Sequence, residues 1–240
     1  ATNPSPASGE ESASTKQTLE SASTQQTLEE ITLAMLEQLG AAVRPARHVP
    51  NTGALKWVLD MLASAEPPEE LNMEWFSMGD AETAELAEAL KTNKSVKVLK
   101  LRYNEIRDQG AVALASALEV HPCLETLTLG NNLIGNLGAE KLAGAIAARG
   151  VLTRLDLRYN QMGPELAAPF CTMESVTALD IRANRLTSLP SKLGELTNLK
   201  ELIVERNHDL APKSFTAPNL AVTELLELIR TQPLDGSGVV

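Results

Sequence analysis

The side chains most suited to catalysis, three histidines and two cysteines, stand at positions that do not form a reactive arrangement. His48, His121 and His208 fall in unrelated predicted loops, so their spacing supports neither a Ser-His-Asp nor a Cys-His arrangement for nucleophilic catalysis. Together with Cys123 and Cys171, these histidines also lack the spacing of metal ligands. We therefore expect neither an enzyme active site nor a metal site.

The glycines do not form a phosphate-binding loop. Gly135, Gly138 and Gly144 are scattered within one predicted return segment, whereas a loop that cradles phosphate groups follows directly after a strand. We therefore expect the protein to bind no cofactor.

Arginine and aromatic side chains indicate a different chemistry, the recognition of another protein. The chain has only two tyrosines, and each directly follows an arginine, as Arg102-Tyr103 and Arg158-Tyr159. Arginine and aromatic residues supply much of the binding energy at protein interfaces. Where these pairs lie relative to one another depends on the elements that carry them.

A repeat with the form Leu-x-x-Leu-x-Leu-x-x-Asn-x-Leu begins at residue 96 and positions these pairs. Its five asparagines are Asn104, Asn132, Asn160, Asn184 and Asn207. In this pattern the leucines point into one continuous core, and each asparagine side chain satisfies buried backbone groups of adjacent coils. The strands are expected to stack as a parallel sheet, with helices on the convex side.

The repeats have two lengths. The starts at 96, 124 and 152 are 28 residues apart and leave room for long helices, predicted at 109–120 and 137–148, whereas the later starts at 176 and 199 follow at 24 and 23 residues. The chain resembles the leucine-rich-repeat family, similar to the ribonuclease-inhibitor-like subclass in residues 68–151 and to the shorter typical subclass in residues 176–210. The resemblance implies an α/β solenoid with a concave parallel sheet, convex return helices and helical caps at both ends.

The rest of the chain divides around these repeats. Residues 1–26 form an acidic Ser/Thr/Gln-rich leader that we expect to be disordered, because so few apolar residues cannot offset the entropy cost of ordering. Residues 27–67 are predicted to form a helical flank and cap, residues 68–210 about six repeats of which the first and last are degenerate, and residues 211–240 a capping helix and a loose tail.

Side chains alternate along a strand, so the residues between the core leucines should point out onto the concave face. The predicted partner-binding residues are Trp75, Lys100, Arg102, Tyr103, Asn131, Arg154, Asp156, Arg158, Tyr159, Asp180 and Arg182. The small residues at 126–131 suggest a recess between the two Arg-Tyr pairs. In the alternative interpretation, the arginines simply pair with Glu74, Asp156 and Asp180 as a solvated face.

The composition narrows the class of partner. A formal net charge of -10 argues against nucleic acid, because binding phosphates requires a clustered cationic surface. No apolar run is long enough to predict a membrane span. We expect a protein partner, an acidic or amphipathic segment of a larger complex.

These features predict a non-catalytic protein-protein interaction module, an adaptor or assembly subunit that binds its partner on the concave face. The alternative is a regulator of a small GTPase, since the Ran GTPase-activating protein also resembles the 28-residue subclass. Two cysteines are too few for the disulfide-bonded caps of extracellular repeat proteins, which favours an intracellular location, cytoplasmic or cytoskeletal. An organelle lumen, reached after removal of a transit peptide, is the other compatible location.

Overall fold

A computed structural model describes residues 52–216 and 221–231. The predicted leader at 1–26, the helical segment that follows it, and the tail after residue 231 lie outside the described residues. The described helices are α2 (Thr52–Leu62), α3 (Asp80–Thr92), α4 (Asp108–Leu118), α5 (Asn136–Arg149) and α6 (Val222–Arg230). Three short 3-10 helices are η1 (Ala168–Thr172), η2 (Ser191–Glu195) and η3 (Lys213–Thr216).

One parallel sheet runs through the repeats. Its strands are β1 (Glu70–Asn72), β2 (Val98–Lys100), β3 (Thr126–Thr128), β4 (Arg154–Asp156), β5 (Ala178–Asp180) and β6 (Glu201–Ile203), and they are hydrogen-bonded in sequence order. The leucine at the centre of each strand pairs in register with the next, from Leu71 through to Leu202. These leucines are buried, because a period-two pattern turns every second side chain into the core. The expected α/β solenoid is thereby confirmed.

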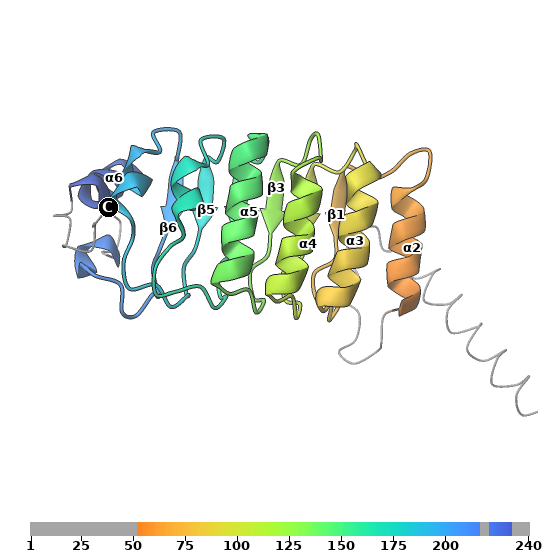
Figure 1. Cartoon of the computed structure of the whole chain (residues 1–240), viewed down its shortest axis with the longest axis horizontal. Helices are drawn as coiled ribbons and strands as arrows, with labels where there is room; N and C mark the ends of the chain where they lie inside the picture. The colour runs from red at the N-terminus through yellow and green to blue at the C-terminus, as the bar shows by residue number, and fades with distance from the viewer. Residues whose placement is uncertain (1–51, 217–220, 232–240) are drawn as a thin grey trace, which may run out of the picture. The chain divides into compact units, whose positions relative to one another are not determined.

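Helices lie along one face of this sheet. Figure 1 shows α2 to α5 side by side in front of the strands, and α3, α4 and α5 pack against one another in turn. The shorter repeats replace the α-helix with η1 and η2, because 24 or 23 residues leave room for less helix than 28. The sheet face opposite these helices, named the open face below, corresponds to the concave face of the predicted solenoid.

The asparagines form a continuous hydrogen-bonded ladder through the core. Each side-chain Nδ2 donates to the carbonyl of the residue three before it and to the corresponding carbonyl in the previous repeat. The Leu129 carbonyl, for example, accepts from both Asn132 and Asn160, each at 3.0 Å. The five asparagines are all at least nine-tenths buried. The ladder therefore links successive coils through groups that would otherwise be buried without partners.

A second set of hydrogen bonds joins the starts of successive helices. Asp80 Oδ1 accepts from the amide of Gly110 at 2.8 Å, and one repeat later Asp108 Oδ1 accepts from the amide of Gly138 at 2.9 Å. A Cβ added to Gly110 would lie 2.7 Å from Asp80 Oδ1, and one added to Gly138 would lie 2.8 Å from Asp108 Oδ1. Glycine at these positions lets a carboxylate approach the free amides of the helix start.

A helix lies beyond the first and the last strand. Helix α2 contacts α3, and α6 contacts η2 and η3. Buried leucines and Ile229 hold α6 in place, with Leu225 and Leu226 facing inward and Leu228 facing out. That α2 and α6 act as caps of the solenoid stays a prediction.

Candidate functional site on the open face of the sheet

The open face carries an arginine-carboxylate network centred on Asp156 of β4. Asp156 Oδ2 accepts from Arg102 Nε at 2.8 Å and lies 2.6 Å from Arg102 NH2, and Arg158 Nε lies 3.6 Å from the same oxygen. Asp156 is 4% exposed, whereas the two arginine side chains are 30% and 22% exposed. The nearly buried carboxylate of Asp156 therefore forms ion pairs with two arginines.

Further ion pairs surround this centre. Arg182 pairs with Asp180 at 2.9 Å, and Arg154 pairs with Glu201 at 3.2 Å. Lys100 reaches Glu70 at the edge of the sheet. The arrangement in which arginines pair with carboxylates of the same face is thus present in the structure.

A hollow of about 120 Å³ opens between these side chains over β4, β5 and β6. Six of the predicted partner-binding residues line it: Arg102, Arg154, Asp156, Arg158, Asp180 and Arg182. Among the lining residues, four arginines face three carboxylates, those of Asp156, Asp180 and Glu201, which leaves an excess of one positive charge. Glu74, which does not line the hollow, also pairs with Arg102 at 3.9 Å, so the positive excess is confined to the residues that line the hollow.

Of the four arginines in this hollow, Arg158 lies farthest from its nearest ion-pair partner, with its Nε 3.6 Å from Asp156 Oδ2. Its terminal guanidinium nitrogens make no hydrogen bond to the described residues, and its Nε is buried without a hydrogen-bond partner. Asp156, its ion-pair partner, already accepts the closer bonds from Arg102. Arg158 is therefore the cation in the hollow with the most capacity for a further acceptor.

The pKa of Asp180 depends on its burial and on Asp156 of the neighbouring strand. Burial raises the pKa of the Asp180 carboxyl, and the negative charge of Asp156 raises it further, while Arg182 acts in the opposite direction. The two aspartates face each other in register on β4 and β5. The floor of the hollow is thus a pair of carboxylates held together by the arginines around them.

The aromatic residues of the open face lie outside the lining of the hollow. The rings of Trp75 and Tyr103 stack with centroids 3.8 Å apart and planes 6° apart, and the Tyr159 hydroxyl accepts a hydrogen bond from Arg206. Tyr159 is 41% exposed. None of the three lines the hollow, and neither does Asn131 or Lys100.

The position that directly precedes each asparagine has a left-handed backbone. Positive φ values occur at Tyr103, Asn131, Tyr159, Ala183 and Arg206. Because residues as different as alanine and tyrosine share it, this conformation belongs to the repeat and does not mark a functional residue.

The small residues of β3 do not form an open recess. The side chain of Arg158 lies over Gly130, where an added Cβ would come within 2.9 Å of its Cγ, and Arg102 crosses β3 to reach Asp156. The buried Thr128 hydroxyl has no hydrogen-bond partner beneath them. The hollow lies farther along the solenoid because long arginine side chains fill the space above β3.

Five lining residues were not among the predicted partner-binding residues: Leu155, Ala178, Leu179, Glu201 and Ile203. Ala178 and Glu201 stand in the same column as Arg154, the outward position just before the central leucine of each strand. Because Arg154 was predicted from this column, the same alternation pattern would also have identified Ala178 and Glu201.

The described residues bring no catalytic set together. His121 is buried at 2% exposure and is not an accessible loop side chain, His208 is exposed at a turn, and His48 lies outside the described residues. Burial raises the pKa of the Cys171 thiol to about 11, which keeps it protonated near neutral pH. Within the described ranges, no three His, Cys, Asp or Glu residues group as metal ligands do.

None of the helices in these ranges combines the length and the apolar character that crossing a membrane requires.

The family model described as "Leucine Rich repeat" matches residues 92–115, 120–143 and 151–169. Comparison with curated proteins gave no significant match. Among solved structures, the chain is similar to one described as "Leiomodin-1 Actin-Binding Site 2 (ABS2)", with 20% sequence identity, coverage of 76% of this chain and 90% of that chain, and a TM-score of 0.47. The matched segments cover β2, β3 and β4 and the first parts of α4 and α5. The chain therefore contains leucine-rich repeats, and its six-stranded parallel sheet with alternating helices is an α/β leucine-rich-repeat solenoid.

Proposed function

We propose that the chain is a non-catalytic interaction module, an adaptor or assembly subunit, and that it binds a protein partner on the open face of the sheet. Leucine-rich repeats are protein-binding scaffolds in many settings, and the described residues expose an arginine-lined hollow on this face. The observation that carries the proposal is the excess positive charge of the hollow, with Asp156 shared between Arg102 and Arg158.

The ligand that fits this hollow is a carboxylate side chain on an acidic or amphipathic segment of the partner. A carboxylate accepts two parallel hydrogen bonds from a guanidinium, which is the pairing that the free terminal nitrogens of Arg158 support. The stacked Trp75 and Tyr103 and the exposed Tyr159 offer contact area beside it. The acidic group supplies orientation, and the aromatic residues supply buried surface.

We also propose that the repeats with α3, α4 and α5 are of the ribonuclease-inhibitor-like subclass, and those with η1 and η2 of the shorter typical subclass. The α-helices have 13, 11 and 14 residues, whereas η1 and η2 have five each. An intracellular location, cytoplasmic or cytoskeletal, is consistent with two free cysteines.

The double variant Arg154→Ala/Arg158→Ala is expected to lose partner binding at least about tenfold, because it removes two of the four cations that line the hollow. The full chain is immobilised, and proteins captured from cell extract are quantified by mass spectrometry for wild type and variant. Arg102 is left in place, since removing it would strand the buried Asp156 and disturb the fold.

The matched control is Arg107→Ala/Lys141→Ala, which removes the same charge from two exposed positions at the start of α4 and on α5. A partner that uses the open face is lost with the first variant and retained with the control. If every captured protein responds equally to both variants, the open face is not the binding surface.

A further inference from the structure

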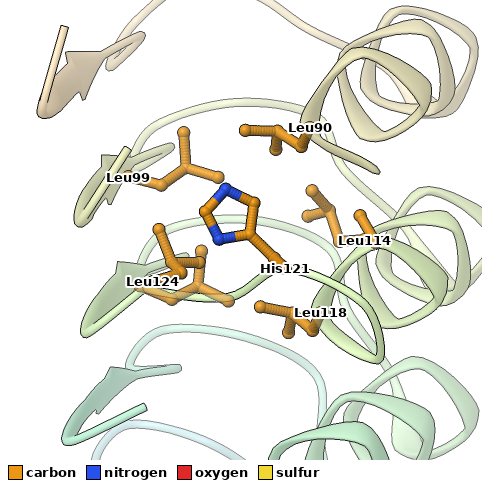
Figure 2. Close-up of a pocket in the computed structure, with 8 residues that line it drawn as sticks. Leu90, Leu99, Leu114, Leu118, His121 and Leu124 are labelled. Carbon is orange, nitrogen blue, oxygen red and sulfur yellow. The ribbon is translucent and has the colours of Figure 1, made fainter. Parts of the chain in front are cut away.

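His121 occupies an unusual place for a titratable side chain. It lies in the turn between α4 and β3 and is 2% exposed. Figure 2 shows its imidazole pointing inward among Leu90, Leu99, Leu114 and Leu118, with Leu124 on the same turn. The turn therefore places an ionisable ring inside the core between two repeats.

The protein gives this ring no hydrogen-bond partner. Neither Nδ1 nor Nε2 of His121 bonds to any described residue. Two small cavities of about 10 Å³ each touch the ring, and apart from His121 the first is lined only by leucine and alanine residues. A water molecule requires two or more polar partners, which leucine and alanine side chains do not supply.

The residues equivalent to His121 in the neighbouring repeats are also polar, but their side chains have hydrogen-bond partners. Asn93 and Arg149 stand 28 residues before and after His121. The Oδ1 of Asn93 accepts from the amides of Ser95 and Val96, each at 2.9 Å, and its Nδ2 donates to the Leu62 carbonyl. Asparagine thus satisfies this turn from within, whereas His121 fills the same place with an unpaired ring.

One charged residue faces this ring among the residues that line the two cavities. Those residues come from α3, β2, α4, β3 and α5 and their connections, and only Arg149 of α5 carries a charge. Its Nε donates to the His121 carbonyl at 3.1 Å. Burial lowers the pKa of His121, and the positive charge of Arg149 lowers it further, while Glu119 and Glu125 on the flanking chain are exposed. The surroundings offer a protonated imidazole no acceptor and no opposite charge.

We propose that His121 is an acid-sensitive lock of the turn at residues 119–125: the neutral ring holds the turn closed against the core, and protonation releases it. The turn also carries Cys123, whose thiol donates to the Lys94 carbonyl at 3.1 Å in the previous repeat. Opening therefore loosens the junction between the second and third repeats.

The direction of the pH effect follows from linkage. The folded pKa of His121 is below the unfolded value of about 6.5, so the closed turn binds fewer protons than the open one. The stability of the closed turn is fully present above about pH 6.5 and is lost progressively as the pH falls from there to the folded pKa. Each pH unit in that window raises the opening equilibrium constant by up to about tenfold.

The test uses His121→Asn, because asparagine satisfies the equivalent turn 28 residues earlier, at Asn93. Hydrogen exchange of peptides that cover residues 113–127 is measured by mass spectrometry from pH 7.5 to 5.5. The exchange rate of the wild type is divided by that of the variant at each pH, after correction for sequence-dependent intrinsic rates. This ratio removes the pH dependence of the exchange chemistry itself. The ratio is expected to rise by up to about tenfold between pH 6.5 and 5.5. His208→Asn, at an exposed turn, is the matched control and should exchange like wild type.

A second measurement on the wild-type chain keeps the proposal testable if His121→Asn does not fold. The imidazole resonances of the three histidines are followed by NMR against pH, assigned with His48→Asn and His208→Asn. His121 is expected to titrate below pH 6.5 and together with the amides of residues 119–125. A His121 that titrates near pH 6.5 without change in those amides, or a wild-type-to-His121→Asn exchange ratio that does not vary with pH, overturns the proposal.

Discussion

Replacement of Asn132 by alanine is expected to lower the free energy of unfolding by about 3 kcal/mol. The Nδ2 of Asn132 donates to the Leu101 and Leu129 carbonyls at 2.9 and 3.0 Å, and its Oδ1 accepts from the Ile106 amide at 3.1 Å. Alanine removes these three hydrogen bonds and a longer one to the Gly130 carbonyl at 3.5 Å, and it leaves the Ile106 amide buried without this acceptor. Two of these bonds are each worth about 1 kcal/mol, and an orphaned buried amide costs at least as much again. Urea unfolding followed by circular dichroism measures the loss.

The carbonyls that Asn132 contacts are not left without partners, which limits the cost. Leu101 keeps a bond from Asn104, and Leu129 keeps one from Asn160. The control is Asn198→Ala, because Asn198 is exposed and donates one hydrogen bond to the Glu174 carbonyl. This variant should lose about 0.5 kcal/mol or less. Equal losses in the two variants would mean that the ladder adds nothing beyond an ordinary surface hydrogen bond.

The repeat pattern was sufficient to predict the sheet. The leucines at 99, 127, 155 and 179 were placed at strand centres by their spacing, and the structure pairs them in register. Helix α5 was predicted at 137–148 and spans Asn136–Arg149, whereas α4 was predicted at 109–120 and ends at Leu118. Helix α4 ends two residues early, although the His121 amide still donates to the Ala117 carbonyl at 2.9 Å.

Helix α3 was not predicted, although its repeat was. Phe76 replaces the asparagine in that repeat, so the pattern was read as a degenerate first unit and not extended to its helix. The contacts of Asp80 and Asp108 with the next helix were also missed. Their 28-residue spacing is visible in the sequence, but a carboxylate at a helix start has many roles, and spacing alone does not identify its partner.

The sequence predicted which residues share the open face but not how their side chains pair. Alternation along strands placed Arg102, Asp156 and Arg158 on one face, and the structure brings them together. The sequence did not show that Arg102 reaches across a whole strand to Asp156. The alternation along a strand predicts which side chains point outward. Which of these side chains pair with one another depends on their length and on the small residues that lie between them. Gly130 is the residue that makes room for Arg158.

Replacement of Asp156 by asparagine is expected to lower the free energy of unfolding by about 2 kcal/mol at neutral pH. Asparagine keeps the shape of the side chain and an acceptor for the Arg158 amide, which bonds Asp156 Oδ1 at 3.0 Å. It removes the charge that balances Arg102 and Arg158. Loss of a nearly buried partner usually costs more, but both arginines are partly exposed, and solvent screening reduces the penalty. Chemical unfolding of the variant at pH 7 measures this loss.

The matched control is Asp209→Asn, which removes the same charge at an exposed turn and should leave stability within about 0.5 kcal/mol of wild type. Equal losses in Asp156→Asn and Asp209→Asn would show that the Asp156 network does not stabilise the open face.

The same substitution should lower the pKa of Asp180, because the charge of Asp156 is one of the two causes that raise it. An aspartate with a raised folded pKa stabilises the protein below its unfolded value of about 3.9, and this contribution is lost as the pH rises through the folded pKa. In Asp156→Asn the difference between the folded and unfolded pKa of Asp180 becomes smaller. Asp180 then opposes folding less at neutral pH, and this gain offsets part of the stability lost with the ion pairs. Carboxyl NMR titration reports the shift directly. An Asp180 that titrates identically in both proteins would mean that the charge of Asp156 does not contribute to the pKa of Asp180 across β4 and β5.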